Sequence, residues 1–205
     1  MSKSIAYNCD CMELMRDTPD KFYDLCICDP PYGIGAACMK RGNGAVQPDK
    51  SKKWDDKPPE QAYFTELFRV SKNQIIWGGN YFGLPPTRCV LVWDKGETMY
   101  GRSFSEIEMA WTSFDESARI FKLSPNDAGR IHPTQKPVRI YEWQLSLFAH
   151  PGDKILDTHL GSGSSRIAAY NLGFGFTGCE IDKDYFDAQE TRFAAHTAQM
   201  NMFID

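Results

Sequence analysis

Short apolar stretches, rich in β-branched and aromatic residues and separated by turn residues, recur through the first part of the chain. This pattern is typical of buried β-strands. It predicts strands at residues 5–8, 23–28, 74–77, 89–93, 107–111 and 119–123.

The pattern then changes to a regular alternation of helical and strand-like segments. A helix is predicted over 138–148, after Pro137, and another over 164–172, closed by Gly173. Strands at 154–157 and 175–180 and a last helix over 184–200 complete the alternation. We therefore expect an α/β fold with a doubly wound, mostly parallel, Rossmann-like sheet. A chain of 205 residues fits a single domain.

Residues 36–59 depart from this pattern, because glycine, proline and lysine dominate them without periodicity. Long loops of this kind are usually functional or disordered. We expect residues 36–59 to be a mobile loop that contacts a macromolecular partner, and residues 112–131 to be a second candidate for that task.

The net charge of −4 argues weakly against nucleic acid as the partner, since phosphate contacts favour basic proteins. The basic residues are nevertheless concentrated in two stretches, 40–53 and 117–139, each with five lysines and arginines against one aspartate. Two solvated loops would explain this distribution about as well as a DNA-binding face. The candidate DNA contacts are Lys40, Arg41, Lys50, Lys52 and Lys53 in the first segment, and Arg119, Lys122 and Arg130 in the second.

The cysteine pattern favours reduced, buried thiols over a metal site. There are seven cysteines, and four of them form Cys-x-Cys pairs at 9/11 and 26/28, where zinc sites use Cys-x-x-Cys. We expect no metal and a cytoplasmic protein. No apolar run approaches the roughly 20 residues that a membrane helix needs, so no membrane partner is expected.

A glycine turn, DTHLGSGSS at residues 157–165, lies between a predicted strand and a predicted helix. Glycines there let a ligand approach the backbone and leave helix N–H groups free to bind it. Glu180 ends the next strand, where a carboxylate can accept hydrogen bonds from both hydroxyls of a ribose. The two features together predict a nucleoside-bearing cofactor, although a Gly-x-Gly turn alone is often only structural. Arg166 stands where a dinucleotide site has a third small residue, which favours S-adenosylmethionine over NAD.

The sequence DPPY at residues 29–32 directly follows the predicted strand 23–28. Pro30 and Pro31 fix their own φ angles and restrict the residue before each of them, so Asp29 is held stiffly. The Asp29 carboxylate and the Pro30 carbonyl can then face one substrate amino group as two acceptors. Tyr32 offers a ring on which a nucleobase flipped out of a duplex can stack. A rigid strand-end turn with a solvent-facing aspartate is the alternative interpretation.

These motifs resemble those of the amino-group DNA methyltransferases, which modify N6 of adenine or N4 of cytosine. Residues 29–32 look like the catalytic motif of that family, residues 157–165 like its cofactor loop, and HPTQKP at 132–137 like the segment before that loop. The order of the motifs resembles the permuted class called β. The resemblance implies S-adenosylmethionine as cofactor and DNA as substrate.

The resemblance also implies roles for individual residues. Asp10 should contact the cofactor adenine, Glu180 its ribose, and the segment 132–136 its methionine carboxylate. The full set of implied cofactor contacts is Asp10, Cys11, His132, Thr134, Gln135, Lys136, Asp157, His159, Gly161, Ser162, Gly163, Ser164, Glu180 and Ile181.

Two departures from the family pattern change these expectations. Thr158 and His159 stand where relatives often have Pro-Phe, so the contacts at His159 differ from theirs. Many relatives also carry a large target-recognition insert, whereas here only residues 36–59 and 112–131 are available. We therefore expect loose sequence preference.

Several alternatives stay open at this point. Cytosine N4 has the same chemistry as adenine N6, although Asp29 at the first position of the motif favours adenine by resemblance. A cofactor-binding or DNA-binding module without activity, an RNA or a protein amide as substrate, and a homodimer all remain open. Cytosine C5 methylation is disfavoured, because it needs a cysteine nucleophile, usually after a proline, and the chain has no Pro-Cys. The small size is typical of an enzyme from a phage or mobile element, in a bacterial or phage-infected host cell, and a partner restriction enzyme stays open.

Overall fold

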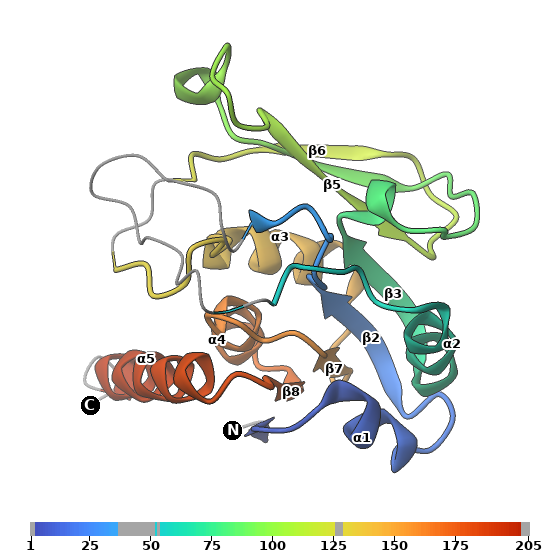
Figure 1. The fold of residues 1–205 in the computed structure, drawn as a ribbon. Coiled ribbons are helices and arrows are strands. Elements are labelled where there is room, and N and C mark those ends of the chain that lie inside the picture. The colour runs from blue at the N-terminus through green and yellow to red at the C-terminus, as the bar shows by residue number, and fades with distance from the viewer. Residues whose placement is uncertain (1–2, 37–51, 53, 126–128, 202–205) are drawn as a thin grey trace.

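Eight strands of the described residues form one twisted sheet in the computed structural model (Figure 1). The structure describes residues 3–36, 52, 54–125 and 129–201. The strands, in chain order, are β1 (Ser4–Tyr7), β2 (Tyr23–Cys28), β3 (Ser71–Trp77), β4 (Val90–Asp94), β5 (Ile107–Thr112), β6 (Arg119–Lys122), β7 (Lys154–Asp157) and β8 (Gly175–Cys179).

The order across the sheet is β1-β8-β7-β2-β3-β5-β4-β6. Every pair is parallel except β3 with β5 and β4 with β5. The chain leaves β2 toward β3 on one side and leaves β7 toward β8 on the other. The topological switch point therefore lies between β2 and β7, and open α/β sheets bind their ligands beyond the carboxyl ends of the strands at such a point.

Helices cover both faces of the sheet (Figure 1). They are α1 (Cys11–Arg16), α2 (Gln61–Val70), α3 (Val138–Phe148), α4 (Ser164–Asn171) and α5 (Lys183–Asn201). Side chains alternate between the faces of a strand, so each central strand contributes to two cores. Leu25 and Ile27 of β2 belong to the core beneath α3 and α4, whereas Cys26 and Cys28 belong to the core beneath α1 and α2.

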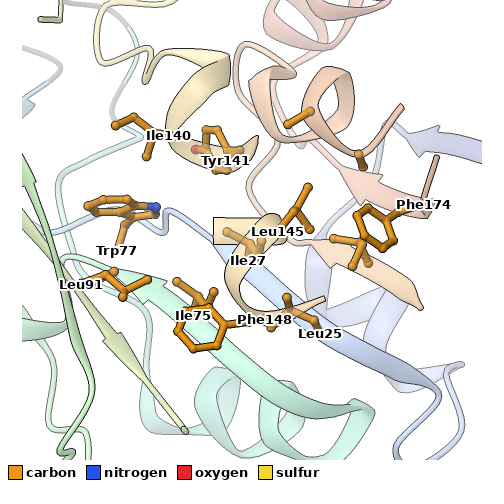
Figure 2. Close-up of a cluster of buried hydrophobic side chains, with 14 of the residues drawn as sticks. Leu25, Ile27, Ile75, Trp77, Leu91, Ile140, Tyr141, Leu145, Phe148 and Phe174 are labelled. Atoms are coloured by element: carbon orange, nitrogen blue, oxygen red, sulfur yellow. The ribbon is translucent and has the colours of Figure 1, made fainter. Parts of the chain in front are cut away.

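The α3 core contains the bulkiest buried rings (Figure 2). Trp77 at the end of β3 packs edge-on to Trp93 of β4, with ring centroids 6.5 Å apart. Ile140 and Tyr141 of α3 lie over Trp77 in Figure 2. Residues 132–137 lead directly into α3. The packing of α3 therefore positions this segment above the switch point.

The predicted mostly parallel α/β sheet is confirmed, and the boundaries of β2, α3 and β7 are those expected. The sequence pattern did not predict α1 or α2, and it placed the start of β3 at residue 74 instead of Ser71. Helix α2 begins without a side-chain cap, and its buried Tyr63, Phe64 and Val70 are residue types more common in strands. No helix in the described ranges is long and apolar enough to cross a bilayer.

Candidate active site

The two motifs predicted to carry the chemistry follow the two strands at the switch point. Asp29 is the first residue after β2, and the glycine turn follows β7. The strands are direct neighbours, with Leu25 paired to Ile155 and Cys26 to Leu156. The register brings both motifs to the same edge of the sheet.

Two adjoining cavities lie at this edge. The larger has a volume of about 510 Å³ and includes Asp29, Pro30, Pro31 and Tyr32 in its wall. The smaller has a volume of about 80 Å³ and includes His159, Gly161, Ser162 and Glu180. Six residues line both cavities: Asp29, Pro31, Trp54, Thr134, Gln135 and Lys136. The corner at 29–32 and the glycine turn therefore share one cleft.

The Asp29 carboxylate is held by two side chains. Its Oδ1 accepts a hydrogen bond from the Tyr32 hydroxyl at 2.6 Å, and its Oδ2 accepts one from Lys136 Nζ at 2.5 Å. A carboxylate offers about four lone-pair sites, so acceptor capacity remains for a substrate amino group. Burial raises the pKa of Asp29, and the adjacent Lys136 ammonium opposes that rise.

Lys136 connects Asp29 to a second acid that the sequence analysis did not single out. Its ammonium lies 3.0 Å from Glu108 Oε2, and Glu108 Oε1 lies 2.8 Å from Lys95 Nζ. Burial favours the neutral form of Lys136, but the carboxylates of Asp29 and Glu108 raise its pKa. Burial likewise opposes ionisation of Glu108, but the two lysines hold its pKa at about 2. The network places a permanent positive charge beside Asp29, whereas the family resemblance places Lys136 near the methionine carboxylate.

The Tyr32 ring packs against Gly78, which has no side chain. A Cβ at Gly78, which has φ +69°, would lie 2.2 Å from Tyr32 Cε1. The ring also stacks on Tyr81, with centroids 4.9 Å apart and planes 13° from parallel. The GGN turn after β3 thus fixes the orientation of the Tyr32 ring and hydroxyl.

Asp55 fixes the backbone that follows the DPPY corner. Its Oδ1 accepts hydrogen bonds from the N–H groups of Tyr32 and Gly33 at 2.6 and 2.9 Å, and its Oδ2 accepts one from Ala36 at 2.7 Å. The residue is only 1% exposed. Asp55 belongs to the segment 36–59, whose described part packs against the corner.

We expect Asp55→Asn to lower the free energy of unfolding by about 1–3 kcal/mol, because the new NH2 group would face a buried backbone N–H and leave it unpaired. Urea denaturation measures this change. The neighbouring Asp56 is exposed, so Asp56→Asn is a matched control that should stay within about 0.5 kcal/mol of the parent. Equal stability of the two variants would contradict the bonding pattern.

The glycine turn is tied to the carboxylate that ends β8. Glu180 Oε2 accepts a hydrogen bond from Gly161 N at 2.8 Å, and its Oε1 accepts one from Asp182 N at 2.8 Å. At the other end of the turn, the Asp157 carboxylate accepts hydrogen bonds from the His159 N–H and the Ser165 hydroxyl. Burial raises the pKa of Asp157 to about 7.

His159, one of the departures from the family pattern, lines the smaller cavity as a neutral ring. Burial lowers its pKa to about 4, and the ring packs edge-on to Tyr63 of α2 at 5.3 Å. Thr158, the other departure, contacts the Tyr63 hydroxyl through Oγ1 at 2.7 Å. An uncharged aromatic ring therefore occupies the position where relatives often have phenylalanine.

Two buried N–H donors in the shared wall have no hydrogen-bond partner among the described residues. They are Trp54 Nε1 and Gln135 Nε2. The Gln135 side chain is oriented by its other end, since Oε1 accepts from Ile131 N at 3.0 Å. Leaving a buried donor unpaired is costly, and both residues line the cleft, so an acceptor atom on a ligand there would relieve this cost.

Three aromatic rings packed at an angle to one another line one side of the smaller cavity. The His132 ring lies 5.3 Å from the Trp54 ring and 4.3 Å from the Tyr185 ring. Next to them, Lys52 Nζ lies 2.6 Å from Asp182 and 4.5 Å from the centre of the Tyr185 ring.

The remaining predicted cofactor residues lie near the cavities without being among the described residues that line them. Asp10 caps α1, with Oδ1 accepting from Met12 N at 2.8 Å, and Cys11 begins that helix. Ile181 is 68% exposed. The others in this group are Asp157, Gly163 and Ser164.

The predicted DNA contacts fall in different places. Lys40, Arg41, Lys50 and Lys53 lie outside the described residues. Arg119 pairs with Glu116 and Lys122 with Glu97 on the protein surface, while Lys52 pairs with Asp182 and Asp184. Arg130 lines the larger cavity and donates to the Gln135 carbonyl at 2.7 Å.

Comparison with known proteins shows what this chain is similar to. A family model described as DNA methylase matches residues 92–191, a range that begins within β4 and includes β5 to β8 and the glycine turn. The chain is 27% identical to "Putative methylase YubD" of Escherichia coli (strain K12), over 91% of this chain and 88% of that protein.

Solved structures show the same fold. The complex of M1.HpyAVI with SAM aligns with 94% of this chain and 100% of that chain, at a TM-score of 0.64 and 21% identity. The PvuII DNA methyltransferase, described as cytosine-N4-specific, aligns with 94% of this chain and 87% of that chain, at a TM-score of 0.65 and 14% identity. The predicted Rossmann-like methyltransferase fold, with the corner at 29–32 before the glycine turn, is confirmed.

Proposed function

We propose, on the premise that this chain belongs to the amino-group DNA methyltransferases, that it transfers a methyl group from S-adenosylmethionine to N6 of adenine in DNA. The observation that carries the proposal is the shared cleft. Asp29 and Pro31 lie in the wall of both cavities, so a target amino group in the larger cavity and a cofactor in the smaller one would meet at this corner.

The residues of the smaller cavity fit such a cofactor. The Glu180 carboxylate is suited to ribose hydroxyls, and the neutral His159 ring offers an apolar surface. The unpaired donors of Trp54 and Gln135 are suited to the carboxylate of the methionine part. Bound S-adenosylmethionine would supply an electrophilic methyl group to the target nitrogen and would leave as the neutral thioether.

The chain's own contribution is to make the target nitrogen a better nucleophile and to hold it in place. The lone pair of a nucleobase amino group is delocalised into the ring. An acceptor such as Asp29, together with the Pro30 carbonyl, draws on its two hydrogens and favours the pyramidal form with a localised lone pair. The N–H proton leaves toward Asp29 after transfer. Positioning and fixed charges supply the rate, and Lys136 and Tyr32 supply the positioning of Asp29 here.

The choice of adenine over cytosine rests on Asp29 at the first position of the motif. Nucleoside mass spectrometry of DNA from an expressing host tests it, because it distinguishes N6-methyladenine, N4-methylcytosine and the absence of product. We expect N6-methyladenine. Detection of N4-methylcytosine would instead make the chain a cytosine-N4 methyltransferase. The absence of any methylated nucleoside would favour a binding module without activity.

Replacement of Glu180 by glutamine is expected to weaken cofactor binding by about 10- to 100-fold, since hydrogen bonds to a charged acceptor contribute about 1.5–3 kcal/mol. Part of the loss would come from the Gly161 and Asp182 N–H groups that the carboxylate also holds. Isothermal titration calorimetry with S-adenosylhomocysteine measures the change. Asp187→Asn on the outer surface of α5 is the control, with 59% of its side chain exposed. An unchanged affinity in Glu180→Gln would contradict the role in ribose binding.

A further inference from the structure

The larger cavity is surrounded by apolar side chains that remain in contact with solvent. Tyr81 and Phe104 line it while 46% and 40% exposed, and Ile107 and Ile34 line it with similar exposure. Tyr100, 42% exposed, lies in the same connection between β4 and β5 as Phe104. Burial of these side chains contributes little to folding. Exposed apolar groups gathered around one cavity are typical of a binding surface.

The β4–β5 connection, residues 95–106, is held in shape by its own polar contacts. The Tyr100 hydroxyl donates to the Asp94 carboxylate at 2.7 Å, and Gly101 N donates to Glu106 Oε1 at 2.7 Å. Lys122 of β6 reaches Glu97 at 2.8 Å. In Figure 1 the connection extends beyond the sheet, carrying a short helical turn at Glu97–Met99. The exposed rings are therefore presented on a formed loop.

A free positive charge lies among these rings. Arg102 is exposed and lines the larger cavity, and no described residue forms an ion pair or side-chain hydrogen bond with it. This contrasts with Lys52, Arg119 and Lys122, whose charges are engaged by neighbouring acids. Aromatic rings beside an unpaired arginine are the combination that binds unstacked bases and their phosphates.

We infer that Tyr81, Arg102 and Phe104 form the surface that binds DNA on either side of the target base. The inference rests on the proposed function. A single nucleobase would enter the cavity that contains Asp29, so the strand from which it comes must cross the edge of that cavity. Phe104 and Tyr81 would then contact bases next to the vacated position, and Arg102 a phosphate. The surface includes none of the basic residues that the sequence analysis predicted.

The test measures binding of a duplex pool of randomised sequence, by fluorescence anisotropy at several salt concentrations. We expect Phe104→Ala to weaken binding by about 10-fold, as the loss of one stacking ring does. Arg102→Gln should weaken it and reduce the salt dependence by about one phosphate contact. Both variants should bind S-adenosylhomocysteine with parental affinity.

Matched controls lie at the opposite end of β2 from Asp29. Phe22 is 42% exposed, so Phe22→Ala removes a comparable ring, and Arg16→Gln removes an exposed charge at the end of α1. If Phe104→Ala and Arg102→Gln bind DNA as tightly as these controls, the inferred surface is wrong. The same conclusion holds if they change only self-association in gel filtration, which would assign the surface to a second copy of this chain.

The two levels of the proposal fail in different ways. If the parental protein methylates DNA and the Phe104 and Arg102 variants do so with unchanged KM for DNA, only the surface is overturned. If the parental protein neither binds nor methylates DNA, the proposed function fails, and the surface fails with it.

Discussion

Replacement of Asp29 by alanine is expected to reduce kcat for methyl transfer by about 10³-fold, the upper end of what removal of one preorganised electrostatic group costs. The variant loses the acceptor that draws on the amino hydrogens, while the glycine turn and Glu180 are untouched. Transfer of radiolabelled methyl groups to unmethylated DNA measures the rate. Calorimetry with S-adenosylhomocysteine checks that the cofactor cavity is intact.

Asp29→Asn removes the charge of the side chain but keeps its shape. The amide keeps one acceptor oxygen, but its NH2 group meets Lys136 or the Tyr32 hydroxyl, so we expect an intermediate loss of about 10²-fold. Asp115→Asn, at a side chain that is 88% exposed, is the control. If Asp29→Ala retains activity within a few-fold of the parent, the Asp29 carboxylate is not the acceptor of the target amino group.

Replacement of Lys136 by methionine is expected to lower the free energy of unfolding by about 3–5 kcal/mol, as removal of one partner from a buried ion pair does. The Lys136 side chain is 3% exposed, and its ammonium lies between the carboxylates of Asp29 and Glu108. Methionine keeps most of the volume and leaves Asp29 without its counter-charge. Urea denaturation at neutral pH measures the loss.

The pH dependence of this loss has a definite sign. Burial already raises the pKa of Asp29, and removal of Lys136 raises it further. A carboxyl group whose pKa is higher in the folded protein than in the unfolded chain costs the fold least below the unfolded pKa of about 3.9. It lowers the free energy of unfolding as the pH rises above that value. The deficit of Lys136→Met should therefore shrink as the pH falls from 7 toward 4.

A second substitution tests whether the charges act as one unit. Glu108 keeps Lys95 as a partner in Lys136→Met, so Glu108→Gln should cost less stability when it is added to Lys136→Met than when it is made alone. If Lys136→Met costs less than about 1 kcal/mol, or if the deficit does not depend on pH, water screens the three groups and the buried network is not energetically coupled.

The sequence predicted the parts of the fold that local pattern determines. Residues 23–28 and 154–157 alternate apolar side chains between two cores and end in turn residues, so β2 and β7, and with them both motifs, were identified. Helix α2 was missed because its buried aromatic residues and missing N-cap resemble a strand more than a helix.

The contacts around Asp29 could not be predicted in the same way. Glu108 alternates with apolar neighbours in β5 and reads as a solvent-facing strand residue. Its importance comes from Lys95 and Lys136, which other segments bring to it. Asp55 reads as one of two adjacent acids in a proline- and lysine-rich loop, yet Asp55 is buried and Asp56 is exposed. Long-range packing decides such cases, and one sequence does not contain that information.

The position of the cleft at the switch point also determines when the cleft can form during synthesis of the chain. Asp29 is made early in translation, whereas Gly161 and Glu180 are made late. They follow β7, which pairs with β2, and β8, which pairs with β7. A nascent or truncated chain therefore holds one wall of the cleft without the other. Separate expression of two fragments cut between β6 and α3 should give two inert pieces whose activity appears only on reassembly.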